Sequence, residues 1–159
     1  MRTLSIKEGR QTHPITSTPF NETIPAFSPD GKWLAYQSDE SGRDEVYVQP
    51  FPAGGSKTLV SVDGGTEPVW SGNGRELFYR NGDHMMTAAV TTQPEFRVSK
   101  PELLFDKRAW TFPTTRNYDV TSDGRRFLMI MENEQVAAAN HLNIVVNWTV
   151  ELKRLVPSK

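Results

Sequence analysis

The sequence contains no cysteine among its 159 residues. It therefore has no disulfide framework, no thiolate nucleophile and no cysteine-ligated zinc. Cytoplasmic and periplasmic proteins both tolerate this absence, so it does not decide between the two compartments. Histidine is scarce as well, and His13, His84 and His141 have no partner at metal-ligand spacing. We expect each of them at the surface or at the edge of a strand.

Long apolar runs and a basic excess are also missing. No run approaches the roughly 18 apolar residues of a membrane helix, and residues 1–8 turn polar too soon for a secretory signal. We therefore expect a soluble chain that is cytoplasmic as written and does not insert into a membrane. With 18 basic and 19 acidic residues the net charge is −1. A nucleic-acid partner is not expected, because such binding needs a cationic footprint.

Aromatic residues and turn formers are plentiful instead. The chain has 4 Trp, 4 Tyr and 8 Phe, enough to build a packed core, and 11 Gly with 11 Pro. That many glycines and prolines favours short elements joined by turns over long helices. The length is that of one domain.

A repeat organises most of the chain. Residues 25–37, 68–80 and 118–130 each read apolar, Ser/Thr, any residue, Asp/Asn, Gly, Lys/Arg, any residue, apolar, any residue, apolar. The glycines of the three copies, Gly31, Gly74 and Gly124, are spaced 43 and 50 residues apart. Periods of this size are typical of β-propeller blades.

The chemistry of the repeat is that of a β-hairpin. Asp-Gly and Asn-Gly pairs tolerate positive φ and join two antiparallel strands tightly. We therefore predict an all-β fold, a β-propeller of four-stranded blades with about three blades in one domain. Four segments divide the chain, namely closing strands over 1–18 and blades over 19–62, 63–106 and 107–159. Further strands are expected over 45–50, 57–61, 84–90, 102–105 and 141–148.

Closure of the ring raises a second expectation. Propellers usually have four to eight blades, and three blades leave exposed sheet edges. Residues 3–6 and 13–16 have the pattern of the last strands of a blade, so one chain can complete the third blade of another. We predict a homodimer of six blades formed by strand exchange. The alternative is that the chain is a piece of a longer propeller.

Candidate site residues lie where the innermost strands begin, because these ends surround the central channel. The repeats align Ile24, Glu67 and Asn117, and Asp119 follows on the same side of its strand. Glu67, Asn117 and Asp119 carry oxygen ligands that suit Ca²⁺. A metal there would polarise an ester or lactone carbonyl while Glu67 or Asp119 activates water as the catalytic carboxylate. The alternative is structural: Glu67 pairs with Arg116, and Asn117 and Asp119 bond to the backbone.

The loop over residues 110–117 is a candidate ligand-binding segment. Trp110 and Phe112 supply large apolar surfaces at low entropic cost, and Arg116 and Asn117 supply polar contacts. The competing interpretation is that the two aromatic rings pack over a blade. No nucleophile elbow, zinc-protease motif or phosphate-binding glycine loop occurs in the sequence.

The repeat resembles a known family. Residues 27–36, FSPDGKWLAY, resemble the TolB-type propeller repeat of the Tol-Pal system. Segments 38–48, 64–70 and 76–79 are similar to the C-terminal propellers of bacterial membrane-bound Ser/Thr kinases, and 147–153 resembles their last strand. No kinase domain is present, and Gly72-Asn73-Gly74 departs from the usual Ser-Pro-Asp-Gly turn.

The resemblance implies a module that binds a peptide, a protein or a small ligand at the channel mouth and loops, and a periplasmic location. The alternative function is a small Ca²⁺-dependent hydrolase of lactones or esters. It rests on analogy with the six-bladed lactonases of the paraoxonase and gluconolactonase kind, whose own motifs are missing from this sequence.

Overall fold

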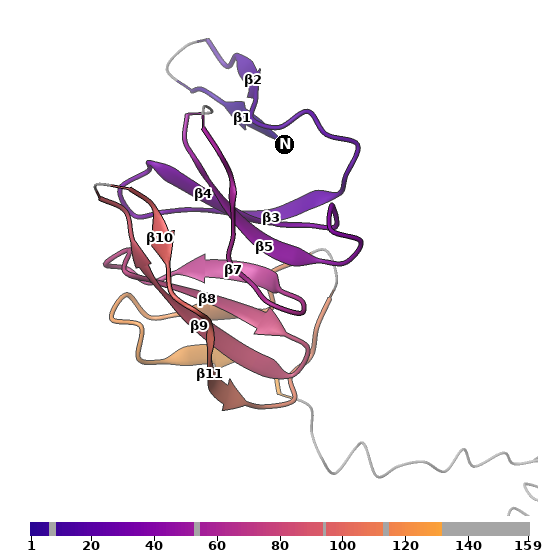
Figure 1. Ribbon diagram of the computed structural model, residues 1–159, viewed down its shortest axis with the longest axis vertical. Helices are drawn as coiled ribbons and strands as arrows, with labels where there is room; N and C mark the ends of the chain where they lie inside the picture. Colours follow the sequence, from indigo (N-terminus) through magenta and orange to yellow (C-terminus); the bar gives the residue numbers. More distant parts are fainter. Residues whose placement is uncertain (7–8, 53–54, 94, 113–114, 132–159) are drawn as a thin grey trace, which may run out of the picture.

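The computed structural model describes residues 1–6, 9–52, 55–93, 95–112 and 115–131. All regular secondary structure in these ranges is β-strand, arranged in antiparallel sheets (Figure 1). The prediction of an all-β fold built from antiparallel sheets is thereby confirmed. The strand expected over 141–148 and the segment 147–153 lie outside the described residues, as does His141.

Within the described ranges, no helix has the length and apolarity needed to cross a membrane.

The first blade is a four-stranded antiparallel sheet. Its strands are β3 (Glu22–Phe27), β4 (Trp33–Ser38), β5 (Glu45–Pro50) and β6 (Thr58–Leu59), and they pair in chain order. The repeat's Asp-Gly turn joins β3 to β4 as expected. Burial increases toward the middle strands, where the alternating aromatic and aliphatic residues of β4 and β5 are covered on both faces.

The second blade follows the same plan with one addition. It contains β7 (Thr66–Trp70), β8 (Glu76–Asn81) and β9 (His84–Thr91) in chain order. The eight-residue β9 is long enough to pair with two further strands, β10 (Arg97–Val98) and β11 (Glu102–Asp106). The short β10 was not predicted, because two residues give no periodic signal.

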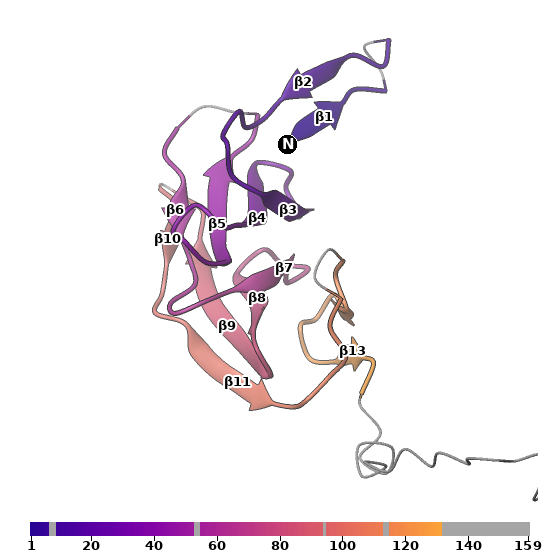
Figure 2. The same cartoon turned by 90° about the vertical axis from the view of Figure 1, so that its right-hand side faces the viewer.

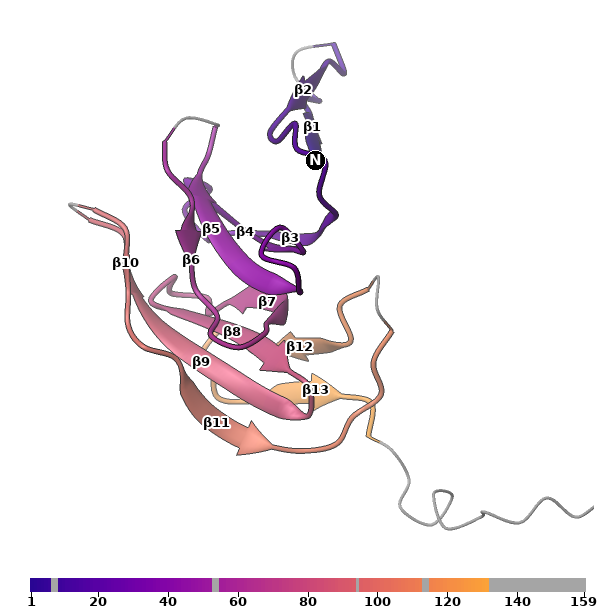
Figure 3. The same ribbon diagram turned by 45° about the vertical axis from the view of Figure 1, so that its right-hand side comes forward.

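Two-stranded sheets lie at the two ends of the structure. β12 (Tyr118–Val120) pairs with β13 (Phe127–Met129), and Figure 3 shows this hairpin beside β7 and β8. β1 (Arg2–Leu4) pairs with β2 (Thr12–Pro14) at the other end. Figure 2 shows the sheets arranged along an arc, with β3 and β7 on its inner side and β6 and β10 on its outer side. The domain boundaries at 18/19, 62/63 and 106/107 stay predictions.

The three turns of the repeat adopt one geometry. Gly31, Gly74 and Gly124 have φ values of 69°, 69° and 71°, in the left-handed region that glycine adopts without a steric penalty. In each turn a hydroxyl donates to the Asp or Asn side chain two residues later, and the same oxygen accepts the backbone N–H two residues further on. These pairs are Ser28 with Asp30, Ser71 with Asn73 and Thr121 with Asp123. Asn73 thus replaces an aspartate without loss of the turn.

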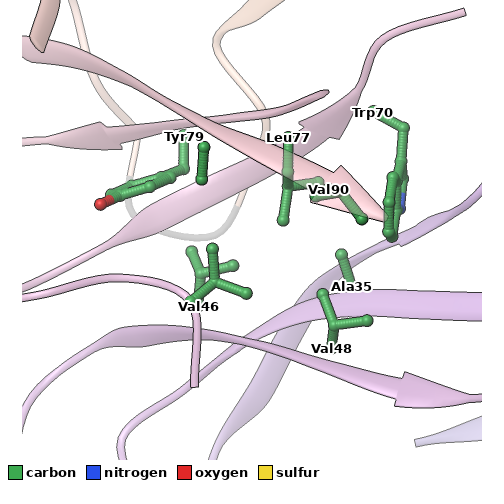
Figure 4. Close-up of a cluster of buried hydrophobic side chains, with 9 residues drawn as sticks. Ala35, Val46, Val48, Trp70, Leu77, Tyr79 and Val90 are labelled. Carbon is green, nitrogen blue, oxygen red and sulfur yellow. The ribbon is translucent and has the colours of Figure 1, made fainter. Parts of the chain in front are cut away.

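The main core lies between the first two blades. Side chains from β4 and β5 face those of β7, β8 and β9, and Figure 4 shows Val46, Val48, Leu77 and Val90 in this layer. Trp70 closes one end of the layer and its indole N–H donates to the carbonyl oxygen of Ala26, at 3.1 Å, across the two sheets. A second cluster joins the second blade to the β12–β13 hairpin through Val69, Phe78, Met85 and Tyr118.

Candidate functional site

The candidate residues other than Asp119 gather on one face of the molecule, which we call the loop face. It is formed by the segments that lead into β3, β7 and β12 together with the β4–β5 and β8–β9 hairpins. Antiparallel pairing places the start of each innermost strand next to the end of the following strand. In the first blade, for example, Glu22 at the start of β3 lies beside Ser38 at the end of β4. The opposite face carries the three repeat turns.

The innermost strands of both complete sheets begin with the same irregularity. Ile24 and Glu67 have left-handed φ angles of 51° and 56°, and the strand register shifts at each of them. Such φ values are unusual outside glycine, above all for a β-branched residue. The alignment of Ile24 with Glu67 in the sequence therefore corresponds to a shared backbone geometry.

Glu67 is bound on both carboxylate oxygens by one residue. The backbone N–H of Asn117 donates to Oε2 at 2.7 Å, and its side-chain amide donates to Oε1 at 3.0 Å. Tyr118 adds a 2.7 Å hydrogen bond from its hydroxyl to the Glu67 carbonyl oxygen. Burial, and secondly the negative charge of Glu67, raise the pKa of Tyr118 well above its usual value. Glu67 is only 4% exposed. A buried carboxylate is costly unless it is hydrogen-bonded, and the bonds from Asn117 meet this need.

Asn117 also closes the loop that carries the aromatic candidates. Its Oδ1 accepts the N–H of Phe112 at 3.1 Å, and its amide donates to the carbonyl oxygens of Phe112 and Thr115 at 3.1 and 2.8 Å. Arg80, which is 1% exposed, supports the other end of the loop. Its guanidinium donates to the carbonyl oxygens of Trp110 and Gly82 at 3.4 and 2.9 Å. The loop is therefore fixed to the second blade at both ends.

The two aromatic side chains of this loop are half exposed and lie against each other. The ring centroids of Trp110 and Phe112 are 6.3 Å apart, with an interplanar angle of 24°. Neither ring is covered by a blade among the described residues. Arg116, on the same segment, forms a 3.9 Å ion pair with Asp119, and both side chains are largely exposed.

A cavity of about 230 Å³ opens on the loop face, between the first blade, the second blade and the aromatic loop. We call it the loop-face cavity. Glu67 and Phe112 from the candidate set lie in its wall. Its full lining consists of Gln37, Asp44, Thr66, Glu67, Gly82, Thr111 and Phe112.

Comparison with solved structures identifies the architecture. A structure assigned to TolB from Agrobacterium tumefaciens matches with a TM-score of 0.50 and 20% sequence identity, over 67% of this chain and 40% of that one. The chain has a TolB-like β-propeller fold. It spans well under half the length of that TolB structure. No known protein-family profile matches the sequence, and no curated protein sequence matches it.

The TolB-like blades bring together only part of the predicted catalytic and metal set. Glu67 and Asn117 are in direct contact, but the amide of Asn117 points its N–H groups, and not its oxygen, at the carboxylate. Asp119 lies apart, in a shallow groove with Arg116 and Leu128, and its Oδ1 accepts the N–H of Val120. Among the described residues no three His, Asp or Glu side chains form a cluster suited to a metal. Calcium binding and catalysis by Glu67 or Asp119 stay predictions.

Three residues of this region were not predicted from the sequence: Gln37, Arg80 and Gly82. Arg80 alone carried a signal, because it is a charged residue in the otherwise apolar run 77–80 of a predicted strand. Gln37 and Gly82 reach the cavity from two different blades, so their proximity depends on how the blades stack.

Proposed function

We propose that this TolB-like propeller is a binding module that holds an extended peptide segment, of a protein or free, on its loop face. The observation that carries the proposal is the half-exposed Trp110–Phe112 pair at the rim of the loop-face cavity. Large aromatic side chains beside an arginine are the residues that contribute most to binding energy in protein interfaces.

The hydrogen bonds that fix the aromatic pair favour the same function. Asn117 and Arg80 hold Trp110 and Phe112 in place before any ligand arrives, so these two residues lose little conformational entropy when a ligand binds. Arg116 at the end of the loop offers a cation to a partner, because its exposed pair with Asp119 at 3.9 Å is weak. A peptide is favoured over a compact ligand since the aromatic surface extends beyond a small cavity.

Selection from a random peptide library on the purified chain tests the proposal. We expect enriched peptides to bind the wild-type chain, and their dissociation constants to rise at least about tenfold in Phe112→Ala and Trp110→Ala, the loss typical of a central aromatic contact. Leu104→Ala is the matched control, because Leu104 is an exposed apolar residue of β11. Peptides that bind all four chains equally, or no enrichment, would contradict the proposal.

We further propose that two copies associate end to end through the apolar ends of the arc. Leu128 on the β13 end is 77% exposed, and Ile6 beside the β1–β2 hairpin is 84% exposed. Exposed apolar patches of this kind mark interaction surfaces. Light scattering is expected to give about twice the 18.0 kDa chain mass, and Leu128→Asp is expected to halve it. A monomer at all concentrations would refute self-association. A periplasmic location is a proposal that rests on the fold likeness alone.

A further inference from the structure

One residue in the wall of the loop-face cavity has a buried acceptor that no described residue satisfies. Gln37 lies in its wall and is 5% exposed, yet its Oε1 has no hydrogen-bond partner among the described residues. An unpaired buried polar atom lowers stability, so a position that retains one calls for an explanation. The terminal amide of glutamine rotates over a broad range, and rotation can turn Oε1 into the cavity.

The charge at the cavity is negative. The Asp44 carboxylate, also in the wall, is exposed and forms no hydrogen bond or ion pair with the described residues. The neighbouring cation Arg43 is directed elsewhere, at 2.7 Å from Glu45 and 3.0 Å from Asp63. Asp44 is therefore the uncompensated charge of the wall.

The other charges near the cavity are bonded within the protein. Glu67 and Arg80 are both buried, and both carboxylate oxygens of Glu67 accept hydrogen bonds from Asn117. The Arg80 guanidinium donates to the carbonyl oxygens of Gly82 and Trp110. Among the described residues it forms no ion pair with Asp44.

The remaining wall also offers acceptors. The Thr66 hydroxyl and the Gly82 backbone lie in the lining, and the exposed Phe112 ring forms part of the rim. A ligand that matches this wall needs several N–H donors, a positive charge and no acceptor of its own. An anion would meet Asp44 and Glu67, and an apolar group would leave Gln37 unpaired.

We propose that the loop-face cavity binds a primary ammonium group, presented by a lysine side chain or a free amino terminus of a peptide that lies across Trp110 and Phe112. This inference rests on the proposed peptide-binding function. An ammonium group has three donors and no acceptor, which fits Gln37, Asp44 and Thr66. The Phe112 ring adds a favourable cation–π contact. The 230 Å³ volume lies below the range of drug-sized ligand sites and fits one side chain or chain end.

The first test uses n-butylammonium chloride and sodium butyrate as separate probes of the whole, isotope-labelled chain. We expect n-butylammonium to give saturable amide shifts at Gly82, Thr111 and Thr66, and butyrate to give none. Asp44→Asn is expected to weaken ammonium binding about tenfold, the loss expected for one charge-assisted hydrogen bond. Asp106→Asn, which removes the same charge from an exposed side chain outside the cavity, is the matched control. Equal weakening by both variants, or equal shifts from both probes, would overturn the proposal.

Gln37→Met separates binding from folding. It removes the unpaired amide at similar volume, so the chain is expected to melt at the same temperature or higher while ammonium binding weakens several-fold. Unchanged ammonium binding in this variant would remove Gln37 from the site and refute the proposal as stated.

Library-selected peptides then identify the source of the ammonium group. Acetylation of the amino terminus abolishes binding if the terminus is held, whereas replacement of lysine by norleucine abolishes it if a side chain is held. Peptides that need Phe112 but tolerate both changes together would overturn the ammonium site and leave the peptide-binding function intact. Absence of any selected peptide would contradict the proposed function while the n-butylammonium titration still decides the ammonium site.

Discussion

Gly72 and Ser122 are in direct backbone contact between two neighbouring repeat turns. A Cβ atom placed on Gly72 would lie 2.4 Å from the carbonyl oxygen of Ser122 and 2.9 Å from its Cα. The first turn has Pro29 where the second has Gly72. The departure from Ser-Pro-Asp-Gly thus has a physical cause, because only glycine leaves room for the adjacent turn at this position.

We expect Gly72→Ala to lower the free energy of unfolding by about 1–3 kcal/mol, the usual cost of forcing extra volume into a packed contact. Backbone atoms of Ser122 cannot move aside as a flexible side chain would. Urea unfolding followed by far-ultraviolet circular dichroism measures the change. Pro29→Ala is the matched control at the same repeat position and is expected to change the value by less than about 1 kcal/mol. An equal loss of unfolding free energy in the two variants would show that the contact with Ser122 does not restrict position 72 to glycine.

Glu67 and Asn117 form the second connection between these blades, and its removal should be costly. Glu67→Ala leaves the backbone N–H of Asn117 without an acceptor and removes one of the three acceptors of its side-chain amide, so we expect a loss of about 2–3 kcal/mol in the free energy of unfolding. Glu67→Gln keeps one acceptor and is expected to lose less. Asp119→Ala is the control, because among the described residues its exposed carboxylate bonds only to its own strand and to Arg116. A loss in Asp119→Ala as large as in Glu67→Ala would contradict the structural role given to Glu67.

The repeat turns could be predicted from sequence because their chemistry is local. The bonds from Ser28 to Asp30 and from Ser71 to Asn73 span two residues, so the motif itself specifies them. The partnership of Glu67 with Asn117 spans 50 residues. The alignment placed both residues at one level but assigned Arg116 as the partner of Glu67 in its structural alternative. Whether Asn117 or Arg116 pairs with Glu67 depends on the spacing and rotation of the two blades. The residue pattern alone does not determine these quantities.

The aspartate of the first turn gives a pH-dependent prediction. The Ser28 hydroxyl, followed by the Lys32 backbone N–H, lowers the pKa of Asp30 below its usual 3.8. Since the folded pKa lies below the unfolded one, the stability that Asp30 contributes is present above pH 3.8 and is lost as pH falls through the folded pKa. A carboxyl titration followed by nuclear magnetic resonance should give an Asp30 midpoint below 3.8 in the wild type.

Two variants check the cause of that shift. Ser28→Ala is expected to move the Asp30 midpoint back toward 3.8. Ser71→Ala, which removes the same hydroxyl from the second turn, should leave it unchanged, because its partner Asn73 does not titrate. Asp30→Asn should retain the turn, as Asn73 does in the second blade, and should lose less stability on acidification than the wild type. An Asp30 midpoint that does not respond to Ser28→Ala would contradict this account.

The calcium hypothesis requires Glu67 to bind a metal ion, whereas the structure shows it bonded to Asn117. The two roles can be distinguished by experiment. Both carboxylate oxygens of Glu67 accept hydrogen bonds from Asn117, and Asp119 lies in a different groove. Bound calcium would therefore have to break these bonds and reach across two sites. We expect the melting temperature to be the same in millimolar Ca²⁺ and in chelator, and we expect no chelator-sensitive turnover of lactones or esters. A Ca²⁺-dependent rise that disappears in both Glu67→Ala and Asp119→Ala would establish the metal site. Turnover lost in the same two variants would then identify a hydrolase.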